Sequence, residues 1–120
     1  MKVMLVPNLQ LGTRLLGPTT DATANHALFQ RYANRLQAEL GIGFQVYVDI
    51  SDGYELLHAA PNDQETTWLA ATAVYEALTP ELRQQHRCLP LTDDQILLKA
   101  TATIVQQLKQ PQKNAPENEF

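Results

Sequence analysis

Residues 44–51 alternate strictly between apolar and more polar side chains, with apolar residues at every even position. Asp52-Gly53 comes next, and residues 54–60 then return with further apolar positions. Asp-Gly between two such runs is a strong hairpin signal, because a tight turn needs positive φ, which Gly adopts freely and Asp tolerates. The pattern therefore predicts a β-hairpin over residues 44–60.

The register of this hairpin predicts a candidate catalytic cluster. A two-residue turn at 52–53 sets Tyr47 directly opposite His58, with Asp49 two residues further along the same face. A histidine beside a carboxylate and a phenol suits general acid–base chemistry, because the carboxylate orients the imidazole and favours its protonated form. The alternative interpretation is a solvated sheet face on which these residues are ordinary strand formers.

The rest of the chain predicts one more strand and several helices. The segments are in the order β-α-β-β-α-α-α, which indicates an α+β fold with a small three-stranded mixed sheet, including the hairpin at 44–60, packed against helices. The expected elements outside the hairpin are a strand at 2–6, a leucine-bearing loop at 8–18, a helix at 21–40 capped by Thr20, a helix at 62–78, a short helix opening at Thr79-Pro80 and a last helix at 92–108 with a Thr92/Gln95 capping box.

The length of 120 residues fits one domain, which we expect to span residues 1–110. Residues 111–120 are mostly polar and contain two prolines, so we expect a disordered C-terminal tail. No internal repeat divides the chain.

Charge and cysteine content narrow the function classes. The net charge of −4 argues against nucleic-acid binding, which requires clustered Lys and Arg against phosphates. The sequence contains no apolar run of membrane-spanning length, so no membrane partner is expected. Cys88 is the only cysteine and sits beside His86 and Arg87, yet the adjoining Leu-Pro indicates a packed structural thiol. We expect a soluble, cytoplasmic protein without a cofactor or a bound metal.

A second set of polar residues surrounds the expected start of the first helix. Thr19, Thr20 and His26 lie where the free amides of a helix N-terminus can receive an anion, so they are candidate ligand-binding residues. The preceding Gly-Pro lacks the glycine spacing and the lysine of a phosphate loop. The alternative interpretation is a surface histidine in a capped helix.

These observations favour a non-catalytic binding or interaction module that acts as a homodimer. A small sheet leaves exposed edges, and pairing across a two-fold axis is a common way to cover them. We expect a protein or small-molecule partner and a pocket between the sheet and residues 9–16. The alternative function is a small enzyme that uses His58, Tyr47 and Asp49 in acid–base catalysis.

Overall fold

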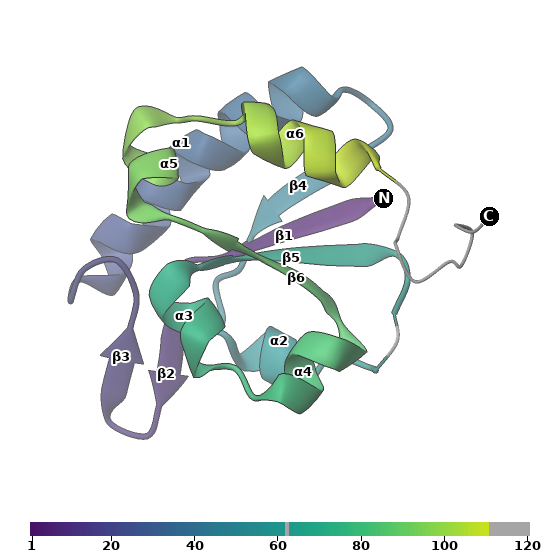
Figure 1. The fold of residues 1–120 in the computed structure, drawn as a ribbon. Coiled ribbons are helices and arrows are strands. Elements are labelled where there is room, and N and C mark those ends of the chain that lie inside the picture. The colour runs from purple at the N-terminus through teal and green to yellow at the C-terminus, as the bar shows by residue number, and fades with distance from the viewer. Residues whose placement is uncertain (62, 111–120) are drawn as a thin grey trace.

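A computed structural model describes residues 1–61 and 63–110, which fold around a four-stranded parallel sheet (Figure 1). The strand order is β4-β1-β5-β6, so the chain moves from β1 to one edge and then returns past β1 to the other edge. This is the winding of a doubly wound sheet. The strands of this sheet are β1 (Lys2–Val6), β4 (Gln45–Val48), β5 (Thr66–Ala71) and β6 (Arg87–Leu91).

The predicted combination of helices with a sheet is confirmed, and the predicted three-stranded mixed sheet is wrong. Helices cover both faces of the parallel sheet (Figure 1). Right-handed crossovers toward opposite edges place their helices on opposite faces, which explains the two layers. One layer contains α1 (Ala22–Leu40), α5 (Asp93–Leu98) and α6 (Ala102–Lys109), and the other contains α2 (Tyr54–Leu57), α3 (Thr72–Ala77) and α4 (Pro80–Gln85).

The long helix α1 confirms the segment expected at 21–40, with a different cap. Asp21, rather than Thr20, caps its N-terminus, because the Asp21 carboxylate accepts hydrogen bonds from the amides of Thr23 and Ala24. Gly41 ends the helix with φ +84°, a conformation that favours glycine. The face of α1 that packs on the sheet is fully buried at Phe29, Tyr32 and Leu36.

The hairpin predicted over residues 44–60 is wrong. Its first arm is the edge strand β4, which pairs in parallel with β1. Asp52 and Gly53 do adopt positive φ, at 52° and 88°, but the chain then enters the single-turn helix α2 instead of a second strand. The amide of Asp49 bonds the Leu5 carbonyl at 2.7 Å, so the pairing of β4 with β1 continues one residue beyond the strand.

The helix predicted over 62–78 is wrong in its first half, and its start at Asn62 lies outside the described residues. Residues 66–71 form β5, which is buried along its whole length between β1 and β6. A strand covered on both faces lacks the alternation of apolar and polar residues that identifies a half-exposed strand. Helix α3 begins only at Thr72.

The segment expected to be a loop at 8–18 contains a two-stranded antiparallel hairpin, β2 (Leu9–Leu11) and β3 (Arg14–Leu16). Gly12 adopts φ +61° in its turn. Leu9 is buried, so this hairpin is anchored to the core where β1 ends. The expectation that its leucines pack down is therefore confirmed for Leu9, whereas Leu11 is exposed.

The C-terminal part confirms two of the predicted caps. Thr79 caps α4 with Pro80 in its first turn, and Thr92 and Gln95 form the capping box of α5. The expected single helix at 92–108 is interrupted at Lys99, whose φ is 51°, and it resumes as α6. The tail expected at 111–120 lies outside the described residues.

The outer strand β6 includes a proline. Pro90 is paired in register with Ala70 of β5, and its ring nitrogen carries no hydrogen to donate. A proline is tolerated in a sheet only where no ladder donor is needed, which is the outer side of an edge strand. Among the helices of the described residues, none combines the length and apolar character needed to cross a bilayer.

Candidate functional site

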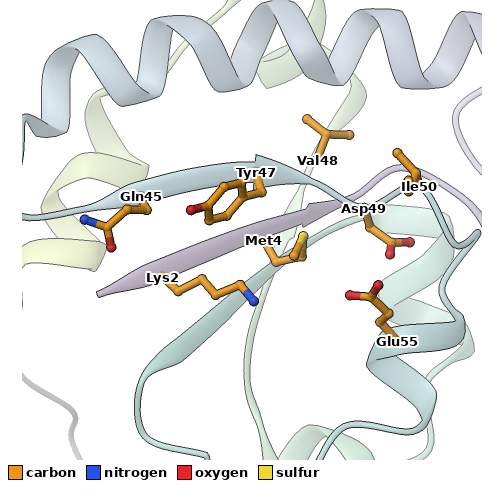
Figure 2. Close-up of a pocket in the computed structure, with 8 residues that line it drawn as sticks. All are labelled: Lys2, Met4, Gln45, Tyr47, Val48, Asp49, Ile50 and Glu55. Carbon is orange, nitrogen blue, oxygen red and sulfur yellow. The ribbon is translucent and has the colours of Figure 1, made fainter.

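A groove of about 360 Å³ runs along the edge strand β4 on the face of the sheet that carries α2 (Figure 2). Parallel pairing sets Lys2 of β1 beside Gln45 of β4, and Met4 beside Tyr47. The groove therefore combines residues from β1, from β4 and from the segment that leads into α2. Its lining residues are Lys2, Met4, Gln45, Tyr47, Val48, Asp49, Ile50 and Glu55.

The centre of the groove combines an aromatic ring with a cation. The Lys2 ammonium lies 5.8 Å from the centre of the Tyr47 ring, within the range of a cation–π contact. Tyr47 is 50% exposed, so its ring is available to a partner. Figure 2 shows Asp49 and Glu55 facing one another at one end, with Gln45 at the other.

At this end of the groove, Asp49 stabilises the turn between β4 and α2. Its carboxylate accepts hydrogen bonds from the Ser51 hydroxyl at 2.6 Å and from the Gly53 amide at 2.9 Å. The Ser51 hydroxyl oxygen in turn accepts from the Glu55 amide at 3.0 Å, which helps α2 to begin. Asp49 is only 4% exposed. Both carboxylate oxygens are thus engaged in holding the turn between β4 and α2.

The structure does not bring His58, Tyr47 and Asp49 together through the predicted register. Tyr47 is opposite Met4 in the ladder, and His58 comes directly after α2 rather than lying on a neighbouring strand. The His58 ring stacks on Tyr54 with 4.0 Å between centroids, and Nδ1 lies 2.9 Å from the Tyr54 carbonyl oxygen. Tyr47 and Asp49 line the groove, and His58 is absent from its lining.

The candidate ligand-binding residues at the start of α1, Thr19, Thr20 and His26, do not form one site. The Thr19 hydroxyl and amide both donate to the Asn25 side-chain oxygen, at 2.6 Å and 3.0 Å, so Thr19 supports the loop before the helix. Thr20 is exposed. His26 lines a second hollow of about 370 Å³, together with Asn8, Ala22, Thr23, Asp49, Ile50 and Asp52. Neither of these two hollows is lined by residues 9–16.

Sequence reasoning missed Lys2 and Glu55 as groove residues. Lys2 enters because the register of the parallel β1–β4 pair sets it beside Gln45, and the sequence pattern indicated the parallel neighbour without fixing that register. The sequence did contain a signal for this neighbour. The strand at 2–6 has apolar residues on both faces, which is typical of a central strand with a neighbouring strand on each side. Among the described residues, no cluster of three or more His, Cys, Asp or Glu side chains has the arrangement to hold a metal ion.

The outer edge of β4 is half covered by one side chain. The Gln37 amide of α1 donates to the Phe44 carbonyl at 2.8 Å, and its oxygen accepts from the Val46 amide at 2.8 Å. Gln37 thus supplies two hydrogen bonds that a neighbouring strand would otherwise make. Exposed apolar side chains gather at and beside this strand, namely Ile42, Tyr47, Ile50 and Tyr54.

Cys88 lies on the edge strand β6. Burial raises the pKa of the thiol to about 11, against a smaller opposing effect of the Arg83 guanidinium. The thiolate is therefore disfavoured near neutral pH, which agrees with the interpretation of Cys88 as a packed structural thiol.

A scan against family models, a search of curated proteins and a search of solved structures each found no match. The class of this protein is defined by its own geometry: a doubly wound parallel α/β domain, with an amphipathic groove beside an edge strand that is only half covered.

Proposed function

We propose that this chain is a non-catalytic interaction module that acts as a homodimer through the surface around β4. The observation that supports this most strongly is the exposure of large apolar side chains beside an incompletely covered sheet edge. Tyr47 is 50% exposed and Ile50 is 81% exposed. Apolar and aromatic residues of this kind supply most of the binding energy when a partner removes them from water.

The edge itself supports an interaction through the backbone. Unpaired peptide groups along an edge strand form a template for another strand, and proteins usually block them with charged side chains or prolines. Residues 42–48 contain no charged residue and no proline. Within the described residues, the Gln37 amide is the side chain that blocks this strand, and it covers only the first half.

The alternative function, acid–base catalysis by His58, Tyr47 and Asp49, has less support. The Asp49 carboxylate is occupied by Ser51 and Gly53, and the His58 ring is stacked on Tyr54. A general base must reach the proton that it removes, and these contacts direct both groups to structural partners. A cytoplasmic location remains part of the proposal, because the lone Cys88 offers no intrachain disulfide.

Sedimentation equilibrium combined with light scattering over a broad concentration range tests this function. We expect a reversible monomer–dimer equilibrium, with about tenfold weaker association for Tyr47→Ser and for Ile50→Ser. Leu97→Ser is the matched control, because Leu97 is 63% exposed but lies on α5. A protein that stays monomeric at every concentration would overturn the proposal.

A further inference from the structure

The peptide groups of β4 point alternately toward β1 and away from the sheet. The amide of Gln45 bonds the Met1 carbonyl at 2.9 Å, and the amide of Asp49 bonds the Leu5 carbonyl at 2.7 Å. In a parallel ladder, residues of one parity bond one neighbour and residues of the other parity face the opposite side. The even-numbered residues, Phe44, Val46 and Val48, therefore direct their peptide groups outward.

The Gln37 side chain bonds some of these outward-facing peptide groups and leaves the others without a hydrogen bond. The Phe44 carbonyl and the Val46 amide are bonded to the Gln37 side chain. The Val46 carbonyl, the Val48 amide and the Val48 carbonyl have no hydrogen-bond partner within residues 1–61 and 63–110. Val48 is thus the residue of this strand that presents a free donor together with a free acceptor.

We infer that the proposed homodimer forms by antiparallel pairing of two β4 strands about a two-fold axis at Val48. A residue with a free amide and a free carbonyl on the same side can exchange both hydrogen bonds with its own copy across such an axis. The Val46 carbonyl then accepts from the Ile50 amide of the second copy. A pairing centred on Val46 is excluded, because its amide is already bonded to Gln37.

Charge does not oppose a second copy at this edge. The chain carries a net charge of −4, so two copies repel each other over most surfaces. Residues 42–48 are uncharged, and the adjoining Asp49 is 4% exposed with its carboxylate bonded internally. The strand is therefore a stretch along which two acidic chains approach without placing like charges in contact.

The same register covers the exposed apolar side chains. With Val48 opposite its own copy, Tyr47 lies opposite Asp49 of the second copy, and the two Tyr47 rings become diagonal neighbours on one face. Ile50 then lies opposite Val46 of the second copy. Both exposed residues on which the proposed function depends, Tyr47 and Ile50, enter the interface.

Disulfide trapping tests the register in a Cys88→Ser background. Val48→Cys places its two thiols at a hydrogen-bonded pair with Cα atoms about 5.5 Å apart, within disulfide range. Val46→Cys is the matched control on the same strand and face, and its two copies lie roughly 14 Å apart in this register. We expect mild oxidation to give a covalent dimer with Val48→Cys and none with Val46→Cys.

Amide hydrogen exchange of the unaltered chain provides a second measurement that needs no substitution. We expect the Val48 amide to become protected as the protein concentration rises, because it is bonded only in the dimer. The Val46 amide, which is bonded to Gln37 in each copy, should not change with concentration.

The outcomes separate this inference from the proposed function on which it rests. Trapping through Val46→Cys, or a dimer by light scattering without trapping at Val48 and without concentration-dependent Val48 protection, would overturn the register and leave the homodimer standing. Protection of Val48 by an added unrelated protein, but not by a second copy, would replace the occupant and overturn the inference. A monomer at all concentrations would overturn both proposals.

Discussion

The Tyr32 hydroxyl donates a hydrogen bond to the Ala100 carbonyl oxygen at 2.8 Å. Tyr32 lies fully buried in α1, and Ala100 lies in the linker between α5 and α6. This contact therefore joins the first helix to the last part of the described chain. Burial, and to a smaller extent the Glu39 carboxylate, raises the pKa of the Tyr32 phenol to about 12.

Tyr32→Phe should lower the free energy of unfolding by about 0.5–1.5 kcal/mol, because the hydrogen bond to the Ala100 carbonyl is lost while the ring contacts remain. Urea denaturation measures this change. Tyr54→Phe is the control, since Tyr54 is 60% exposed, and it should leave stability almost unchanged. Equal effects of the two substitutions would show that the Tyr32–Ala100 bond contributes nothing.

Alkaline pH should weaken the fold through the same phenol. The unfolded chain ionises Tyr32 near the ordinary pKa of 10.0, whereas the folded protein does so only near 12. The stabilisation is therefore fully present below about pH 10 and is lost as the pH rises toward 12. Comparing the pH dependence of unfolding for the wild type and Tyr32→Phe isolates this effect, and superimposable slopes would contradict it.

Gly17→Ala should destabilise the protein by about 1–3 kcal/mol through overpacking. A Cβ at Gly17 would lie 2.6 Å from the Asn25 side-chain nitrogen and 2.9 Å from the Asn8 side-chain oxygen. These two amides bond each other at 2.8 Å and are buried, so they have little room to move. Gly43→Ala meets no atom within 4 Å and should change stability by no more than about 0.5 kcal/mol. Thermal unfolding of both variants provides the comparison.

His86→Leu should leave the protein as stable or raise its stability by about 1 kcal/mol, because removing an unpartnered buried polar group removes its desolvation cost. His86 is 4% exposed, and neither ring nitrogen has a hydrogen-bond partner in the part of the chain that the structure describes. His86→Phe retains an aromatic contact with the Trp68 ring, 6.4 Å away, and tests whether that contact matters. A loss of several kcal/mol in both variants, measured by urea denaturation, would reveal a partner for the imidazole.

The Cys88 thiol should react slowly in the folded protein. With its pKa raised from 9.0 to about 11 by burial, its thiolate fraction near pH 8 is about a hundredfold below that of an ordinary thiol. Alkylation by iodoacetamide should therefore accelerate strongly in urea, or as the pH approaches 11. Ile42→Cys in a Cys88→Ser background provides the exposed reference, because Ile42 is 98% exposed. Equal rates for the two thiols would contradict this prediction.

Structural features that depend on residues close together in the chain could be predicted from the sequence. The caps at Thr79 and Thr92 depend on residues within one turn, and both are present in the structure. The positive φ at Asp52 and Gly53 was also predictable, because residue type determines it. The path of the chain after that turn depends on other contacts: the Asp49 carboxylate accepts hydrogen bonds from Ser51 and Gly53 where α2 begins, and Leu56 of α2 is buried in the core.

The candidate site shows the same division between local and distant causes. Tyr47 and Asp49 were identified as polar groups on one face, and both line the groove. Lys2 joins them through the register of the β1–β4 pair, which no local pattern specifies. Residues 66–71 carried no alternation because both faces are covered, and a short apolar run of this kind is compatible with either a helix or a strand.

Pro90 has a consequence for how far this sheet can grow. The Pro90 ring nitrogen removes one donor from the outer side of β6, which disfavours pairing with an incoming strand there and leaves β4 as the better edge for extension. If two molecules pair through β4, the two free edges of the combined sheet are both β6 strands. In the proposed homodimer, both free edges would therefore lack a donor at Pro90, and this favours a closed pair over a filament.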